Sequence, residues 1–238
     1  MNKLFGTDGM RAEAGKFPLD RDTIVTVGRA LSRHLTEQLG RAPQIITGRD
    51  TRESGAWIEE AFTSGACAAG ASCESAEIIT TPGVAHLAKV LPADVGVVIS
   101  ASHNPYQDNG IKLFAPSGRK LDESIERRIE ADIANRESQN SEAALPQGSA
   151  AAPPAERAAD LQARYLNYLS DEVAPDLRLD GLRVVIDCAN GAASYLAPEL
   201  FARLGATVLP STTLRTAATS ISTAALFIFR SFASTSSN

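Results

Sequence analysis

The chain has 238 residues, 44% of them hydrophobic and 21% charged, which excludes a disordered or fibrous protein and allows one or two globular domains. Its formal net charge of −5, from 23 Lys and Arg against 28 Asp and Glu, leaves no basic excess for binding a nucleic-acid backbone. The first residues lack an apolar signal core, and no apolar run approaches the ~20 residues of a membrane span. We therefore expect a cytoplasmic protein without a membrane or nucleic-acid partner.

Helical and strand spacings of apolar residues alternate through the first 137 residues. From 20 to 39 the apolar side chains recur on one helical face, with Asp20 as N-cap and Gly40 as C-terminal stop. Residues 94–99 form a continuous apolar run, typical of a central strand covered on both faces. The other expected helices are 54–69, 82–91 and 122–136, and the other expected strands are 44–48, 73–79 and 110–114. This alternation predicts an α/β fold: a doubly wound, mixed but mainly parallel sheet with helices on both faces.

The composition divides the chain into four segments. Residues 1–137 form the first domain, and 138–155, rich in Ala, Ser, Gln, Pro and Gly, read as a linker. In 156–210 the patterns predict helix 156–169, strand 183–188, helix 193–204 and strand 207–209. One strand–helix–strand unit is too small to close a core by itself, so we expect an incomplete second α/β domain.

The last segment, 211–238, departs from the rest of the chain in composition. It holds 13 Ser or Thr residues, no Gly and no acidic residue. The apolar stretch Leu226–Phe229 lacks a clear flanking periodicity. We expect this tail to be aberrant rather than evolved domain sequence.

The segment Ser100–Lys112 carries the strongest chemical signal, because it follows the central strand directly. Open α/β sheets place ligands beyond the carboxyl ends of their strands. Ser102 there is a candidate nucleophile or phosphoryl carrier, and His103 and Lys112 are candidates for moving protons or stabilising charge. The turn at Asn104-Pro105 would expose the serine hydroxyl. The residues alone leave open a serine that only hydrogen-bonds a strand-end turn.

Two further loops are rich in Gly and charge. Phe5–Arg11 would present Arg11 as a fork of donors for a phosphate. Gly48–Gly55, which contains Arg49, lies between a strand and a helix, where backbone N–H groups favour anions. Each loop alone is equally consistent with a tight turn that carries solvated charges. Three such loops in one small domain favour a phosphorylated ligand.

Other chemistries lack support in this sequence. Ser102 has no Gly-x-Ser-x-Gly surroundings, and the chain has neither a Walker loop nor Gly-x-Gly-x-x-Gly. Asp20 and Asp22 open a helix, so capping explains them better than metal binding. The remaining candidates are interpreted as packing residues or as buried thiols without metal-ligand spacing: His34, His86, Trp57, Cys67, Cys73 and Cys188.

Taken together, the loops resemble those of the α-D-phosphohexomutase superfamily. The resemblance covers about residues 3–209 and is carried by Phe5–Arg11, Gly48–Arg52, Ile99–Pro105, Asp108–Lys112 and Val184–Gly191. The residues around the serine are most similar to the branch that interconverts glucosamine 6-phosphate and glucosamine 1-phosphate, for UDP-N-acetylglucosamine and cell-wall synthesis. The alternatives are a phosphomannomutase/phosphoglucomutase relative or a non-catalytic phosphosugar-binding domain.

The resemblance implies a mechanism and a set of site residues. Ser102 would be a phosphoserine that gives its phosphoryl group to the sugar phosphate, forming a bisphosphate that reorients and returns the other phosphate. A Mg²⁺ ion would bind an oxygen of the phosphoserine at Ser102. The resemblance assigns Lys112 to acid/base work or charge stabilisation, and it places supporting roles on Arg11, Arg49, His103 and Asn104. The partner would be a phosphorylated amino sugar, and the oligomeric state stays open.

The sequence also departs from the superfamily pattern. The aspartate-rich metal loop and the loops of the third and fourth domains have no counterpart, and Ala12 stands where Gly commonly follows the arginine. Relatives would continue from Pro210 with a string such as Ile-His-Asn-Thr-Pro-Asp-Gly-Arg-Asn-Ile-Asn. One nucleotide sequence, read in neighbouring frames, can encode both that string and Ser211–Ile221. We expect a single-base insertion or deletion near codon 210, weak Mg²⁺ binding, and a shortened copy without mutase activity.

Overall fold

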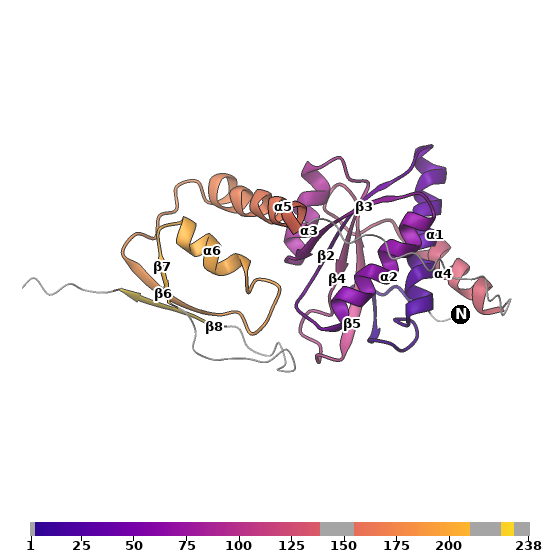
Figure 1. Cartoon of the computed structure of the whole chain (residues 1–238), viewed down its shortest axis with the longest axis horizontal. Helices are drawn as coiled ribbons and strands as arrows, with labels where there is room; N and C mark the ends of the chain where they lie inside the picture. The colour runs from indigo at the N-terminus through magenta and orange to yellow at the C-terminus, as the bar shows by residue number, and fades with distance from the viewer. Residues whose placement is uncertain (1–2, 139–154, 210–224, 231–238) are drawn as a thin grey trace, which may run out of the picture.

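The computed structural model describes residues 3–138, 155–209 and 225–230 (Figure 1). Its first sheet consists of five strands: β1 (Met10–Glu13), β2 (Gln44–Arg49), β3 (Ser72–Ile78), β4 (Val95–Ile99) and β5 (Asp108–Phe114). They lie in the order β1-β5-β4-β2-β3. Both pairings of β2 are parallel, whereas β5 pairs antiparallel with β4 and with β1. The predicted mixed α/β sheet is confirmed, but the expectation of mainly parallel pairing is wrong, because half of these four pairings are antiparallel.

Strand β1 is an element of the first sheet that the sequence pattern did not predict, and strand β8 (Ala225–Arg230) of the second sheet was not predicted either. The four residues of β1 follow a glycine turn and show no strand periodicity of their own. They become a strand by pairing with β5, where Met10 faces Ile111 and Arg11 faces Gly110. A short edge strand of this kind depends on its partner rather than on local propensity. The pairing places Arg11 beside Gly110 of β5.

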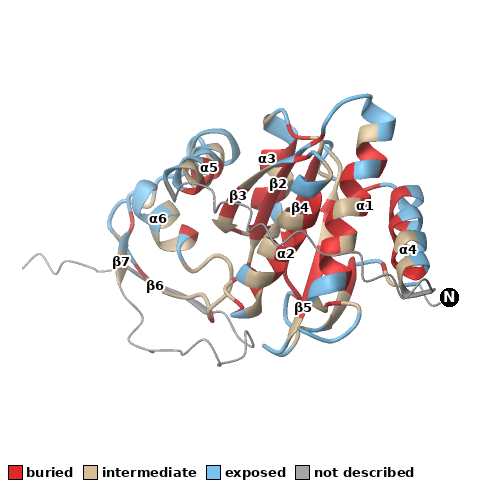
Figure 2. Cartoon of the chain, turned by 45° about the vertical axis from the view of Figure 1, so that its right-hand side comes forward, coloured by how far each residue is buried: buried red, intermediate tan, exposed pale blue. Residues whose placement is uncertain are grey.

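Helices cover both faces of this sheet, as predicted (Figure 2). On one face α1 (Arg21–Leu39), α2 (Ser54–Ala68) and α4 (Glu123–Ser138) enclose the main core, which includes Leu31, Phe62 and Val97. On the other face α3 (Thr81–Val90) and α5 (Ala155–Asn167) form a second cluster with Val98 and Tyr165. Successive residues of β4 thus face opposite cores, which explains why its whole run is apolar.

The predicted helix boundaries of α1 are confirmed by its caps. The Asp20 carboxylate accepts a hydrogen bond from the Thr23 N–H at 3.0 Å, so Asp20 is an N-cap. Gly40 adopts a left-handed φ of 68° and its N–H donates to the Thr36 carbonyl. The interpretation of Asp20 as a capping group is therefore confirmed.

The second unit follows α5 and a π-helical turn, Tyr168–Val173. It contains β6 (Leu182–Asp187), α6 (Leu196–Arg203), β7 (Thr207–Leu209) and β8 (Ala225–Arg230). Parallel β6 and β7 joined by α6 confirm the predicted strand–helix–strand unit. Strand β8 pairs antiparallel with all six residues of β6. The linker interpretation falls mostly on 139–154 and the aberrant-tail interpretation mostly on 210–224 and 231–238, which lie outside the described residues.

The packing interpretations hold for the histidines and Trp57 but not for all the cysteines. His34 is buried with Nε2 2.8 Å from Asp132 Oδ2, His86 stacks on Tyr168 at 3.7 Å, and Trp57 packs against the main core. Cys67, expected to be buried, is exposed. It follows the buried Ala66 on α2, and one helical step turns it away from the core. Cys73 and Cys188 are partly buried, and burial raises the pKa of both thiols.

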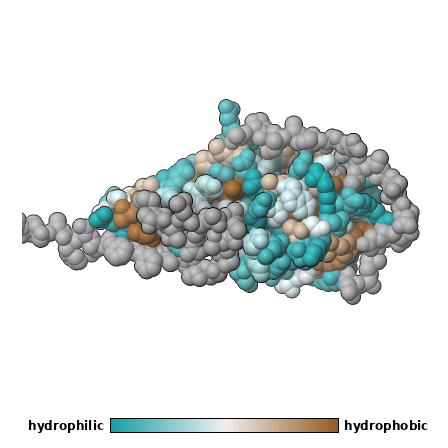
Figure 3. Space-filling view, turned by 60° about the horizontal axis from the view of Figure 1, so that its bottom comes forward, coloured by the Kyte–Doolittle hydropathy of each residue, from teal (hydrophilic) through white to brown (hydrophobic). Residues whose placement is uncertain are grey.

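In the face seen in Figure 3, the described residues are mostly hydrophilic, and the hydrophobic patches are small and separated. The exposed large apolar side chains lie on different elements: Phe17, Leu39, Val90, Tyr106, Val173, Leu177 and Tyr195. Within the described ranges no helix combines the length and apolar character needed to cross a bilayer.

Candidate functional site

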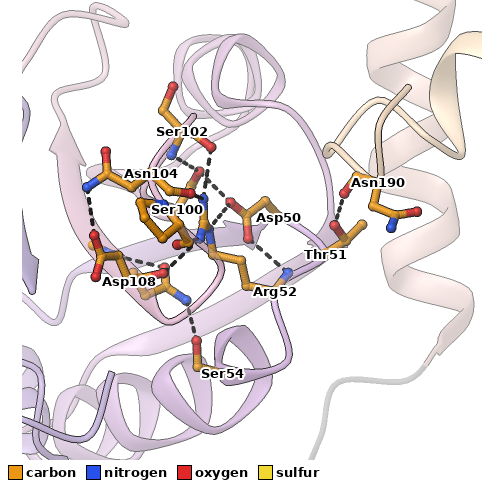
Figure 4. A network of polar contacts seen from close by, with 12 residues as sticks. Asp50, Thr51, Arg52, Ser54, Ser100, Ser102, Asn104, Asp108 and Asn190 are labelled. Carbon is orange, nitrogen blue, oxygen red and sulfur yellow. Dashed lines mark hydrogen bonds and ion pairs between the residues drawn. The ribbon is translucent and has the colours of Figure 1, made fainter. Parts of the chain in front are cut away.

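The loops after β2 and β4, both singled out in the sequence, meet at one edge of the first sheet (Figure 4), and Arg11 of the third loop contacts Asn104 there. Parallel strands β2 and β4 end side by side at Arg49 and Ile99, so the loops that follow them start from the same edge. Antiparallel β5 begins there at Asp108. The edge is the carboxyl end of the parallel pair, where open α/β sheets present ligand-binding side chains.

Ser102 stands exposed on the loop after β4, in an unusual backbone conformation. Its φ is 58°, in the left-handed region that few residues other than glycine adopt. Holding a non-glycine residue there costs about 1–3 kcal/mol, so the surroundings must fix it. The Ser102 N–H donates to Ser100 Oγ at 3.0 Å, and the Ser102 carbonyl accepts from Arg52 Nη2 at 2.9 Å. Both peptide groups that flank the residue are thus held.

Beneath the serine lies a buried ion pair that sequence reasoning did not single out. Asp50 and Arg52 are 3% and 5% exposed, and Arg52 Nε lies 3.1 Å from Asp50 Oδ2. The same Asp50 oxygen accepts from the Ser100 hydroxyl at 2.7 Å. Asp50 Oδ1 accepts from the Arg52 N–H at 3.1 Å. The sequence signal was two opposite charges directly after a buried strand, but only the folded loops show that both are enclosed.

Arg11 and Asn104, two predicted site residues, are in contact. Arg11 Nη1 donates to Asn104 Oδ1 at 3.3 Å, and Asn104 Nδ2 donates to Asp108 Oδ2 at 3.0 Å. Arg11 also lies 3.6 Å from the exposed Asp8 carboxylate, and its Nε is buried without a hydrogen-bond partner. The β1–β5 pairing thereby brings a guanidinium to the loop that carries Ser102.

Lys112 lies next to Arg11 at the β1–β5 ribbon. Its side chain passes over Gly9, where an added Cβ would come 3.0 Å from Lys112 Cγ and 2.3 Å from the Ile111 carbonyl oxygen. Burial lowers the pKa of the Lys112 ammonium, and the nearby positive charge of Arg11 lowers it further. Asp8 and Asp50 oppose part of this shift. The amine therefore releases its proton at a lower pH than an ordinary lysine, which suits acid/base work.

We expect this shift to be visible in the reactivity of Lys112. Acetic anhydride acylates only the neutral amine, and the lowered pKa produces that form at lower pH in the folded chain than in the unfolded one. Acylation of the Lys112 peptide, followed by mass spectrometry across pH, should give a lower midpoint in the folded chain than in urea. Arg11→Gln removes a like charge and should move the folded midpoint upward. Equal midpoints for folded and unfolded chain would contradict the assignment.

The other two predicted residues are placed differently. His103 is exposed on the same loop as Ser102. Arg49, at the end of β2, forms an ion pair with Glu59 of α2, with Nε 3.0 Å from Oε2. Glu59 is itself buried and accepts from the hydroxyls of Thr47 and Ser75. The guanidinium of Arg49 is thus engaged by α2, and its role in binding a phosphate stays a prediction.

The second unit reaches the same edge through the turn after β6. Ala189 and Asn190 have left-handed φ values of 48° and 58°, at the predicted Asn190-Gly191 turn. The Thr51 hydroxyl, in the loop after β2, donates to the Asn190 carbonyl (Figure 4). The two units therefore contact each other beside the Ser102 loop.

The residues at this edge do not make a metal site by themselves. Within the described ranges no group of three or more His, Cys, Asp or Glu side chains is arranged to hold an ion. The two carboxylate oxygens of the buried Asp50 already accept hydrogen bonds from Arg52 and Ser100. The expected Mg²⁺ would find one phosphoserine oxygen, too few ligands for a hard cation.

Comparisons with known proteins show the family to which the chain is similar. Residues 2–140 match the family described as phosphoglucomutase/phosphomannomutase, alpha/beta/alpha domain I. Relatives named phosphoglucosamine mutase from Solibacter usitatus and Chelativorans sp. are 47% and 46% identical over 208 and 209 residues. Each match covers 87% of this chain but 44% and 45% of the relative. The chain thus spans less than half the length of these curated relatives.

Solved structures support the fold. A phosphoglucomutase/phosphomannomutase family protein from Burkholderia thailandensis superposes with a TM-score of 0.70 and 24% identity. It covers 91% of this chain and 45% of its own. A putative phosphomannomutase from Thermus thermophilus gives 0.64 and 23%, over 87% and 45% of the two chains. Identities this low speak for the architecture and not for the substrate.

Proposed function

Since this chain belongs to the phosphoglucomutase/phosphomannomutase family, we propose that it carries the phosphoryl-transfer serine of a phosphohexose mutase, at Ser102. The proposed substrates are glucosamine 6-phosphate and glucosamine 1-phosphate. Residues 1–137 are proposed as the domain that bears this serine, and 156–210 as part of a second domain. The observation that carries the proposal is the exposed Ser102 on a rigid left-handed turn, with Arg11 and Lys112 on the adjoining strands.

The proposed step transfers one phosphoryl group between two oxygens. In the phosphorylated state, the bond between Ser102 Oγ and phosphorus breaks while a sugar hydroxyl oxygen forms a new bond to phosphorus. The sugar hydroxyl gives up its proton and the serine oxygen gains one, so protons and electrons balance. The resulting bisphosphate reorients and then returns its other phosphoryl group to Ser102 by the reverse step. Such transfers depend on positioning and charge stabilisation more than on covalent chemistry.

The transfer requires a group that holds a phosphate and a group that exchanges a proton, and Arg11 and Lys112 suit these two roles. Arg11 has a fork of fixed donors that can hold a phosphate bidentately. Lys112, whose pKa is lowered by burial and by Arg11, can exchange a proton with the sugar hydroxyl more readily than an exposed lysine. Asn104 bridges Arg11 and Asp108 and so ties the serine loop to the same ribbon. His103, exposed beside the serine, is proposed to contact the transferred group.

The choice of an amino sugar rests on the relatives. Those at 47% and 46% identity are named phosphoglucosamine mutase, and each match covers 87% of this chain. Because the chain spans less than half their length, we expect transfer to Ser102 but no mutase turnover by these 238 residues alone.

The test is the uptake of phosphorus from a bisphosphate. Purified chain is incubated with glucosamine 1,6-bisphosphate, or with the glucose or mannose compound, and its intact mass is followed over time. We expect a gain of one phosphoryl group, located by peptide mapping to Ser102 and fastest with the amino sugar. Equal rates with all three donors would favour the phosphomannomutase/phosphoglucomutase alternative. Binding by calorimetry without any uptake would favour a non-catalytic phosphosugar-binding domain.

A further inference from the structure

The buried ion pair Asp50–Arg52 also forms hydrogen bonds with the loop that carries Ser102. Building on the proposed role of Ser102, we propose that Arg52 and Asp50 are positioning residues. They hold the serine in its left-handed conformation and thereby set the rate of phosphoryl transfer. Neither side chain is proposed to touch the sugar.

The side chain of Arg52 donates hydrogen bonds to backbone carbonyls of the serine loop. Nη2 donates to the carbonyls of Ser102 and Asn104, both at 2.9 Å. Nη1 donates to the carbonyl of Pro105 and to that of Asp108 at 2.9 Å. The planar guanidinium of Arg52 thus donates to four carbonyls within a seven-residue stretch. A turn fixed in this way cannot rotate the Ser102 peptide without breaking several charge-assisted hydrogen bonds.

Asp50 completes the network on the other side of the serine. Its Oδ2 accepts from Arg52 Nε and from the Ser100 hydroxyl, and Ser100 Oγ in turn accepts the Ser102 N–H. Hydrogen bonds therefore run from Arg52 through Asp50 and Ser100 to the Ser102 N–H, and Arg52 also binds the Ser102 carbonyl directly. The Ser102 peptide groups are fixed from both ends while the hydroxyl stays exposed (Figure 4). A strained backbone conformation persists at a reactive residue when several contacts fix it in this way.

The experiment compares Arg52→Lys and Ser100→Ala with the unaltered chain. Lysine keeps the charge but loses the planar fork, and Ser100→Ala removes the acceptor of the Ser102 N–H. We measure the rate of phosphoryl uptake against glucosamine 1,6-bisphosphate concentration, and amide hydrogen exchange in 100–109. We expect the maximal rate to fall by about tenfold or more in both variants, with the half-saturating concentration unchanged. Exchange at the Ser102 amide should accelerate while that of α1 stays the same.

A matched control is Arg41→Lys, which alters another Arg–Asp pair. Arg41 binds Asp94 bidentately at 2.8 Å, but it is exposed and bonds no residue of the serine loop. Its uptake rate should equal that of the unaltered chain. A wild-type maximal rate in Arg52→Lys, or in Ser100→Ala if the first variant does not fold, overturns the positioning role.

The two proposals fail in different ways. If the unaltered chain takes up no phosphoryl group from any donor, the proposed function falls. Hydrogen exchange then decides the positioning role alone: faster exchange at Ser102 in both variants supports it, and unchanged protection overturns it.

Discussion

Ser102→Ala is expected to abolish phosphoryl uptake from glucosamine 1,6-bisphosphate completely. The substitution removes the only atom proposed to bond phosphorus and leaves the loop otherwise intact. Alanine tolerates the left-handed φ of 58° about as well as serine does, and the other loop bonds come from backbone groups. The free energy of unfolding should therefore stay within about 0.5 kcal/mol of the parent. Intact mass after incubation, together with urea unfolding, measures both quantities.

The matched control is Ser117→Ala, an exposed serine in the turn after β5. This variant should take up one phosphoryl group at the parental rate. Uptake that persists in Ser102→Ala would place the acceptor elsewhere and contradict the assignment of the site. A large loss of stability in Ser102→Ala would instead show that the hydroxyl supports the fold.

The second large effect is expected at the contact between α1 and α2. These helices approach so closely that a Cβ on Gly65 would lie 2.0 Å from the Val25 carbonyl oxygen. A Cβ on Gly28 would lie 2.1 Å from the Phe62 carbonyl oxygen. Backbone atoms cannot move aside as a flexible side chain can, so the helices must separate and lose core contacts. Gly65→Ala should lower the free energy of unfolding by about 3 kcal/mol or more, measured by urea titration.

Two variants sharpen this test. The double variant Gly28→Ala/Gly65→Ala should cost less than the sum of the single changes, because helices already forced apart by one Cβ accommodate the other. Gly6→Ala serves as the control, since its Cβ meets only the Gly9 carbonyl oxygen at an ordinary 3.6 Å. That change should stay within about 0.5 kcal/mol. A neutral Gly65→Ala would mean that the helices pack less closely than described.

Much of the fold was predictable from local patterns. The helical stripe of α1, its Asp20 cap and its Gly40 stop are encoded within twenty residues of sequence, and the structure places them as expected. The continuous apolar run of β4 likewise predicted a strand buried on both faces. Periodicity identifies an element, but it does not state the direction of its neighbours. The antiparallel pairings of β5 and the existence of β1 were therefore missed.

The site shows the same division. The residues expected around the serine were visible as a motif. In the structure Arg11 contacts Asn104 of the Ser102 loop, and Lys112 lies near Arg11 on the adjoining strand. Arg49 was expected to bind a phosphate, yet its described ion pair is with Glu59. Arg52 stood only three residues away and was not distinguished from it. The sequence around Arg49 and Arg52 gives no reason to assign them different roles. The structure distinguishes them, because Arg52 is more deeply buried than Arg49.

The sequence by itself determined most of the helices, the central strands and the loop that bears the exposed serine, because those properties depend on residues within one or two turns of each other. The tertiary structure decided which charges are removed from water. Asp50 and Arg52 are enclosed because the loops after β2 and β4 fold over each other. In that enclosure both Nη atoms of Arg52 donate to backbone carbonyls and its Nε donates to Asp50. Desolvation depends on what covers a residue, and the segments that cover these two lie about 50 residues further along the chain.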